Sequence, residues 1–230
     1  MILRRTAATL LLLAPLLAAA PGTARAEDDD GVYGRLDGDL GLRLGAGAAL
    51  AQGDPSLSLD AAAVYLDTAG LYLHYTDALG SDAAIARSLA TGVHFQPLFL
   101  ARYASDLEHG PPHLDLLLDS VALGIGAFWG APRGDSLAST PGLEVALSLA
   151  FPLLPDATGP YLGLRGALRW RAADLHGTTG ADALERGAFL ALTLRWHHVL
   201  DANLVDPRDG LLRASRPSPR VGWRSPGDAR

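Results

Sequence analysis

The most regular feature of the chain is an alternation in which every second residue is apolar. Successive side chains of a β-strand point to opposite faces, so a period of two predicts strands with one apolar and one polar face. In the clearest example, Leu162, Leu164 and Leu168 share one face, while Arg165 and Arg169 share the other. A helix would mix these two sets. The same pattern predicts strands over residues 36–44, 142–151, 160–171 and from 188 onward.

Weaker alternation predicts further strands over residues 57–67, 71–76, 88–103 and 113–129. Pro97 interrupts the third of these and implies a bulge or an early strand end. The apolar phase of the fourth changes at Asp119 and Ser120, where a bulge would restore the register. A short helix over residues 81–91, capped by Ser81, is an alternative to part of the third strand. The pattern therefore predicts an all-β fold of about eight strands.

The predicted connections alternate in length. Those expected to be long are residues 47–55, 77–84, 130–141 and 173–183, and those expected to be short are 68–70, 106–112 and 155–160. Outer-membrane barrels have short periplasmic turns and longer outer loops. The even number of strands and the loop asymmetry therefore favour an antiparallel up-and-down transmembrane β-barrel.

Both ends of the chain differ in character from the alternating region. Residues 1–26 combine Arg4 and Arg5, an apolar stretch and a closing Ala24-Arg25-Ala26, which predicts a signal peptide cleaved after Ala26. Residues 27–31 form a short acidic segment, residues 32–200 the barrel, and residues 201–230 a Pro- and Arg-rich tail typical of disorder.

Composition excludes several kinds of chemistry. The sequence has no cysteine and no lysine, so disulfides, thiolate metal sites and Schiff-base chemistry are excluded. The segment 1–26 carries three arginines and no acid, so its removal changes the net charge from −6 to −9. This acidic balance argues against a nucleic-acid partner.

Alternation alone does not say which face points outward. The polar face carries small residues and charges of both signs, which can fill the narrow interior of an eight-stranded barrel. We therefore expect the leucine face to meet lipid and the polar face to form a lumen network. Its predicted members are Arg35, Asp37, Asp39, Arg43, Asp60, Glu144, Arg165, Arg169, Arg171 and Arg195. The alternative is a soluble periplasmic lipocalin-like barrel with the leucines inside, around a lipophilic ligand.

Aromatic residues fall at the ends of the predicted strands, as in the interfacial girdles of membrane barrels. These residues are Tyr33, Trp129, Phe151, Tyr161, Trp170 and Trp196. Together with the export signal, alternation and loop pattern, they make residues 32–200 resemble the small eight-stranded bacterial outer-membrane β-barrel family. The resemblance is architectural and rests on no signature motif. Family members usually end on an aromatic residue of the last strand, whereas about thirty residues follow Trp196 here.

The resemblance implies a protein of the Gram-negative outer membrane that contacts its lipids and is inserted by the outer-membrane assembly machinery. We expect a structural or surface-interaction role with a plugged lumen, no cofactor, and a surface or periplasmic protein as a further partner. A small pore is the alternative, in which the charged residues line water.

Two arrangements suggest chemistry only weakly. His74-Tyr75-Thr76 is similar to the His-x-Ser segment of lipid A deacylases, which would make His74 a general base and Thr76 a nucleophile, although threonine replaces serine. Lumen-facing polar residues are the simpler interpretation, so we predict no enzymatic activity. His197 and His198 are adjacent and therefore point to opposite faces of a strand, so we predict no metal site.

Overall fold

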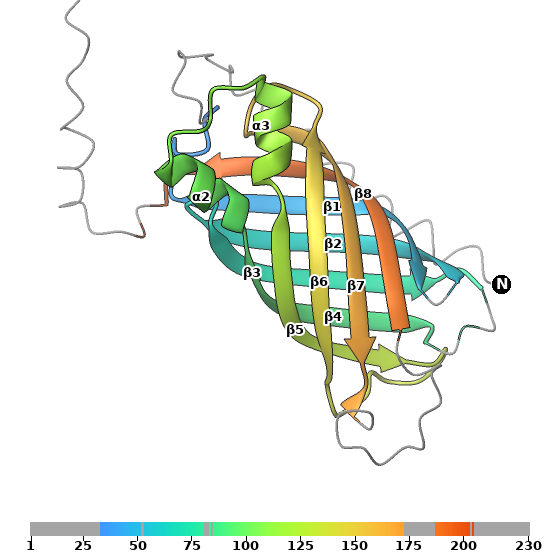
Figure 1. The fold of residues 1–230 in the computed structure, drawn as a ribbon. Coiled ribbons are helices and arrows are strands. Elements are labelled where there is room, and N and C mark those ends of the chain that lie inside the picture. Colours follow the sequence, from blue (N-terminus) through green and yellow to red (C-terminus); the bar gives the residue numbers. More distant parts are fainter. Residues whose placement is uncertain are drawn as a thin grey trace, which may run out of the picture.

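In a computed structural model of the chain, eight antiparallel strands form a closed barrel in the order β1 to β8 (Figure 1). The structure describes residues 33–51, 53–80, 83, 85–172, 187–202 and 204. The predicted signal peptide, the acidic segment and most of the predicted tail lie outside these residues. Each strand pairs with its neighbour in sequence, and β1 pairs with β8, from Leu40 opposite Leu200 to Ala51 opposite Phe189. The predicted fold class is confirmed.

The strands follow the alternation of the sequence, including the two weakly predicted segments at residues 57–67 and 71–76. Their bounds are β1 Leu40–Ala51, β2 Asp54–Tyr65, β3 Ala69–Ala78, β4 Arg87–Phe95, β5 Ala122–Ala131, β6 Gly142–Pro152, β7 Gly159–Trp170 and β8 Gly187–Leu200. The first strand begins later than predicted, because residues 33–36 form turns, with Tyr33 and Gly34 at positive φ.

Two short helices replace part of what the sequence predicted as strand. The strand expected over residues 88–103 ends at Phe95, and α2 covers Pro97–Ala104. The strand expected over residues 113–129 is instead α3, Pro112–Asp119, followed by β5. Each helix has proline in its first turn, where its missing N–H costs nothing. The phase change at Asp119 and Ser120 is therefore the end of a helix and not a bulge, and the helix considered for residues 81–91 is wrong because β4 begins at Arg87.

The predicted alternation of loop lengths is wrong in two places. Residues 52–53 alone join β1 to β2, where a long loop was expected, and residues 96–121, with both helices, join β4 to β5, where a short turn was expected. At the end of the barrel where β1 and β2 meet, the other connections are residues 79–86, 132–141 and 171–186, and we call it the loop end. The opposite end has the connections 66–68, 96–121 and 153–158, and we call it the capped end.

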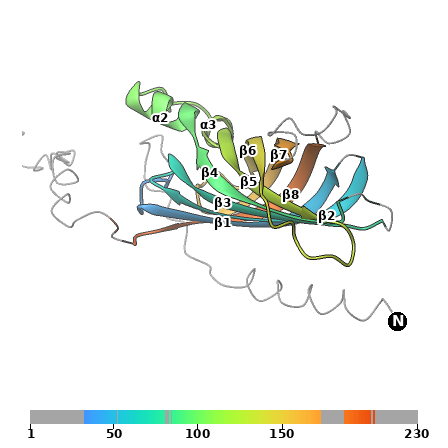
Figure 2. The same ribbon diagram turned by 90° about the horizontal axis from the view of Figure 1, so that it is seen from below.

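The helices lie at the capped end, where β1 begins and β8 finishes (Figure 1). A perpendicular view shows them projecting beyond the strands, on the side of β4 to β6 (Figure 2). The helical connection therefore adds a layer at one end of the barrel.

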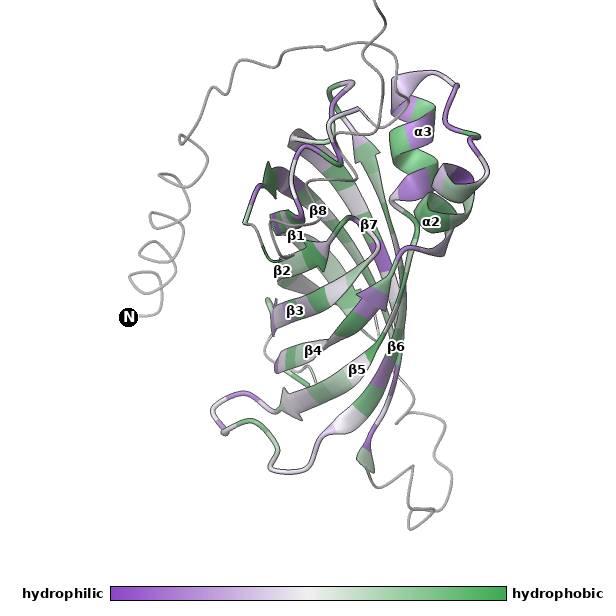
Figure 3. Cartoon of the chain, turned by 90° about the vertical axis from the view of Figure 1, so that its left-hand side faces the viewer, coloured by the Kyte–Doolittle hydropathy of each residue, from purple (hydrophilic) through white to green (hydrophobic). Residues whose placement is uncertain are grey.

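The leucine-rich face points outward. Leu71, Leu123, Ile125 and Leu168 are each more than half exposed, and such residues recur at alternate positions around the barrel. Hydrophobic and hydrophilic colours alternate along the strands, as this arrangement requires (Figure 3). The alternative in which the leucines form a soluble core is therefore wrong. Among the described residues, no helix is both long and apolar enough to span a membrane.

Candidate functional site in the barrel interior and helical cap

Six of the ten residues predicted for the lumen network lie on the inward faces of the strands. These are Arg43, Asp60, Glu144, Arg165, Arg169 and Arg195. The other four were misplaced. Arg35 and Asp39 are buried at the capped end before β1, and Asp37 is exposed there. Arg171 lies just after β7, at the loop end. The late start of β1 explains three of these corrections, because residues before Leu40 do not follow strand alternation.

Glu144 is the centre of the largest interior cluster. Its side chain is fully buried on β6 and accepts hydrogen bonds from Arg165 Nη2 and Arg169 Nε, each 2.6 Å long. The Tyr72 hydroxyl donates a third, at 3.0 Å. β6 and β7 are paired with Glu144 opposite Arg169, so the register of the sheet places the carboxylate beside both guanidinium groups. One acid thus links three side chains from two other strands.

The two arginines also pack against aromatic rings. The guanidinium carbon of Arg165 lies 4.3 Å from the Tyr72 ring centre, and that of Arg169 lies 4.7 Å from the Phe189 ring centre. These rings come from β3 and β8, so the cluster spans the interior. Such contacts stabilise desolvated cations and fill space between the strands.

A second ion pair joins β2 and β8. Arg195 Nε lies 3.0 Å from Asp60 Oδ2, and it also donates to Thr193 Oγ1 at 3.0 Å. Glycine makes room for this pair, since a Cβ at Gly45 would lie 2.5 Å from Asp60 Oδ1 and 2.7 Å from Arg195 Cγ. The absent side chains on β1 are therefore part of the packing of the lumen.

The histidine and threonine considered for catalysis are both buried inside the barrel. His74 Nε2 lies 2.9 Å from Ser58 Oγ, whereas Thr76 Oγ1 lies 2.6 Å from Ser88 Oγ. His74 and Thr76 therefore have different partners. Sequence reasoning missed Ser58, which lies on β2 and meets His74 only through strand pairing. Ser58 and His74 are almost completely buried, so a lipid molecule cannot contact this Ser–His pair.

Four of the six aromatic residues predicted for the girdle lie on outward positions near strand ends, and two do not. Trp196 continues the outward row of Leu190, Leu192 and Leu194 on β8, and Phe151 is exposed on β6. Both lie near the capped end, whereas Trp129 and Trp170 lie on outward positions near the loop end. Tyr65 and Phe95, which were not predicted, are also exposed near the capped end.

The two exceptions are tyrosines that do not lie on the outward face. Tyr161 is buried in the lumen and stacks on His197, with 3.8 Å between ring centres. It shares the inward face of β7 with the arginines, so its place near a strand end was misleading. Tyr33 donates to the carbonyl oxygen of Gly110 at 2.8 Å. It therefore belongs to the cap, by which we mean α2, α3 and the residues before β1 that contact them.

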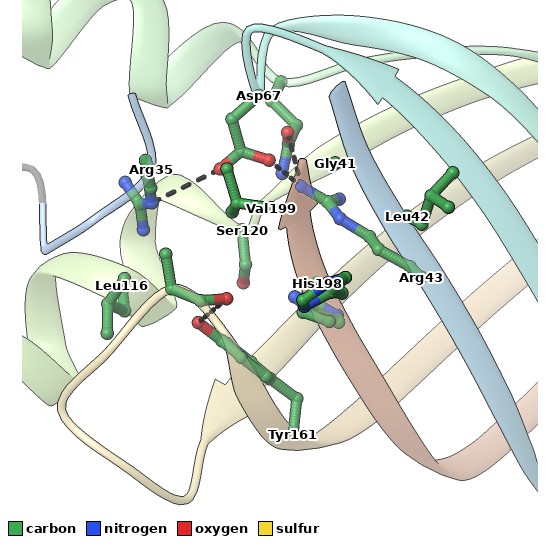
Figure 4. A pocket seen from close by; sticks show the side chains of 13 residues that line it. Arg35, Gly41, Leu42, Arg43, Asp67, Leu116, Ser120, Tyr161, His198 and Val199 are labelled. Carbon is green, nitrogen blue, oxygen red and sulfur yellow. Dashed lines mark hydrogen bonds and ion pairs between the residues drawn. The ribbon is translucent and has the colours of Figure 1, made fainter. Parts of the chain in front are cut away.

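Ion pairs fasten the helices over the capped end. Arg35 binds Asp119 of α3 and lies 3.3 Å, Nε to Oδ2, from Asp67. Arg102 of α2 binds Asp115 and Asp119, the latter at 2.8 Å. Figure 4 shows Asp67 between Arg35 and Arg43 beside the cavity that separates the cap from the barrel. That cavity measures about 20 Å³, room for about one water molecule.

Glu108, in the connection between the helices, has an altered affinity for protons. The pKa of its carboxyl is raised from 4.5 to about 7, mainly by burial and then by the neighbouring Asp119 carboxylate, against the opposing effects of Arg35 and Arg102. Burial opposes the charge of Arg102, yet its hydrogen bond to Asp115 and its acidic neighbours raise the pKa of that guanidinium overall. The cap therefore holds one carboxyl that titrates near neutral pH.

No cluster of three or more histidine and acidic residues in the described part of the chain is placed to hold a metal ion.

A second pocket, of about 290 Å³, opens at the loop end. It lies beside β5 and is lined mainly by apolar residues, among them Ile85, Phe128 and Pro132.

A closed eight-stranded antiparallel barrel with leucines outside and paired charges inside has the architecture of the small outer-membrane β-barrels. The chain is similar to the outer membrane protein OprG from Pseudomonas aeruginosa, with 12% identity and a TM-score of 0.39 over 71% of this chain and 97% of that one. It is also similar to Ail, the attachment invasion locus protein of Yersinia pestis, whose structure holds the heparin analogue sucrose octasulfate, with 10% identity and a TM-score of 0.33 over 69% of this chain and 96% of that one. No family model and no curated protein matches the sequence.

Proposed function

We propose that the protein is a bacterial outer-membrane β-barrel with a closed interior, acting as a structural or surface-interaction protein and not as a pore or an enzyme. The observation that carries this proposal is the inverted polarity of the barrel, with exposed leucines outside and ion pairs inside. An apolar exterior is stable in lipid, where closed strand pairing also satisfies every backbone group.

The proposed closure of the interior rests on two barriers. Glu144, Arg165, Arg169 and Tyr72 bind one another across the lumen. At the capped end, Arg35, Leu116 of α3 and the inward Tyr161 meet around a cavity of only about 20 Å³. Eight strands leave room only for side chains, so paired charges fill the space that a pore would need for water.

We place the loop end outside the cell and the capped end in the periplasm. Three of the four connections at the loop end, 79–86, 132–141 and 171–186, are longer than 66–68 and 153–158 at the capped end. The exceptions are 52–53 at the loop end and the helical connection 96–121 at the capped end. Longer loops face outward in outer-membrane barrels. A surface partner would then bind the loop end. Export through a signal peptide cleaved after Ala26 and insertion by the outer-membrane assembly machinery are parts of the same proposal.

The location is tested by membrane fractionation combined with gel mobility before and after boiling. We expect the mature protein in the outer-membrane fraction, with a folded form that changes mobility only on boiling, and sequencing of its N-terminus to begin at Glu27. A soluble periplasmic protein without a mobility shift would overturn the proposal.

Closure is tested separately by conductance in planar lipid bilayers. We expect no ion channels from the purified folded barrel, with an open porin as the positive control. Regular single-channel steps that disappear when the protein is omitted would refute the closed interior, while leaving the membrane location intact.

A further inference from the structure

The α2 and α3 pair, which we call the helical hairpin, has two chemically different faces. Its inner face contains Phe99 and Leu116, which are buried against the end of the barrel. The outer face exposes large apolar side chains, with Leu100 45% and Leu114 48% accessible. The other exposed apolar residues of these helices are Leu98, Tyr103 and Leu118.

All charged residues of the two helices are used on the inner face. Residues 97–104 contain one, Arg102, and residues 112–119 contain two, Asp115 and Asp119. Arg102 pairs with both acids, and Asp119 also pairs with Arg35. The outer face of these helices is therefore uncharged, which is unusual for a surface that meets only water.

The outer face continues the apolar exterior of the barrel. Phe95 is exposed on β4 and is separated from α2 only by Gln96. On α3, the His113 ring lies 6.2 Å from the ring of Phe151, which is exposed on β6. Beyond α3, the chain enters β5 and soon reaches Leu123, which is 53% exposed.

The figures show the same continuity at the level of whole elements. Both helices stand beside the capped ends of β4 to β6 and beyond them (Figures 1 and 2). Hydrophobic colour extends from the strands onto α2 and part of α3 (Figure 3).

We propose that the outer face of the helical hairpin contacts the membrane itself, at the boundary between head groups and acyl chains of the periplasmic leaflet. This inference rests on the proposed membrane location. An uncharged leucine surface that joins a lipid-facing band fits a lipid surface, and Tyr103 and His113 suit the polar edge of that layer. The hairpin is then held on both of its faces, by ion pairs on the inner face and by apolar contact with lipid on the outer face.

The natural absence of cysteine allows a direct test with single labels. Leu100→Cys and Leu118→Cys variants of the full mature chain are labelled with an environment-sensitive fluorophore and folded into phosphatidylcholine vesicles, with or without nitroxide-bearing lipid. Two matched variants serve as references, Leu192→Cys on the strand exterior and Ser139→Cys in the exposed loop between β5 and β6. Gel mobility before boiling confirms that each variant is folded.

We expect nitroxide lipid to remove most of the emission of the labels at positions 100, 118 and 192, and little of that at 139. If the label at 192 is quenched while those at 100 and 118 behave like that at 139, the helices face water or a protein partner and the inference fails. If the label at 192 also escapes quenching in a folded sample, the membrane location itself is wrong. The two failures are therefore distinguishable.

Discussion

Glu144 offers the sharpest test of how the interior is stabilised. Its carboxylate is fully buried and compensates both Arg165 and Arg169, with two hydrogen bonds of 2.6 Å. A Glu144→Gln substitution keeps the shape of the side chain but removes its charge. Two guanidinium groups then remain inside the barrel without their counterion.

The expected loss can be estimated in two ways. Removing one partner of a buried ion pair costs about 3–5 kcal/mol. Hydrogen bonds to charged groups contribute about 1.5–3 kcal/mol each, so two of them give a similar total. We therefore expect Glu144→Gln to lower the free energy of unfolding by about 3–5 kcal/mol.

The assay is equilibrium unfolding by urea in phospholipid vesicles, followed by tryptophan fluorescence. Asp60→Asn is the matched control, because Asp60 has one arginine partner at 3.0 Å, so its effect should be clearly smaller. Adding Arg165→Gln and Arg169→Gln to Glu144→Gln should recover part of the loss, because the uncompensated charges are gone. A loss below about 1 kcal/mol for Glu144→Gln, or no recovery in the combined variant, would refute the reasoning.

Three further predictions concern other parts of the barrel. Gly45→Ala should destabilise it by about 1–3 kcal/mol in the same urea assay, because the new methyl group crowds an ion pair, whereas Gly80→Ala, with open space around it, should not. Asp39→Ala should speed hydrogen exchange at the amide of Ala202, which donates to Asp39 at 2.7 Å. Glu108 should stabilise the helical hairpin most below pH 4.5 and less as the pH rises through about 7, so the exchange protection of the hairpin relative to Glu108→Gln should fall over this range. The sign follows because the folded cap holds the proton of Glu108 more tightly than the unfolded cap.

Each of these predictions has a clear contrary result. Equal effects of the two glycine substitutions would mean that the interior can shift to admit a methyl group. Unchanged exchange after loss of the Asp39 carboxylate would mean that it does not hold the chain beyond β8. A difference in protection from Glu108→Gln that does not change with pH would mean that Glu108 does not titrate in this range.

The strands and the direction of their faces could be predicted from the sequence because they depend on a local period. Leu162, Leu164 and Leu168 alternate with Arg165 and Arg169 in one short segment, and any strand built from it separates the two sets. The charges and small residues of the polar face then suit a narrow interior better than an aqueous surface. For this reason, the six predicted network residues that lie on strands have inward positions.

The same local rule failed where a segment fits two periods. Leu114, Leu116 and Leu118 alternate as in a strand, yet Asp115 and Asp119 are four residues apart and share one side of α3. Arg35 and Arg102, both distant in sequence, supply the partners that make that side favourable. The helix therefore depends on contacts that no short window of sequence contains.

Sequence alone thus determined most of the strands, their polarity and the class of barrel, because alternation is a local property of the sequence. Only the tertiary structure decided which polar residues meet. Ser58 reaches His74 through the pairing of β2 with β3, and Glu144 meets Tyr72 across the closed barrel. Closure and register bring these atoms together, and both are properties of the whole sheet.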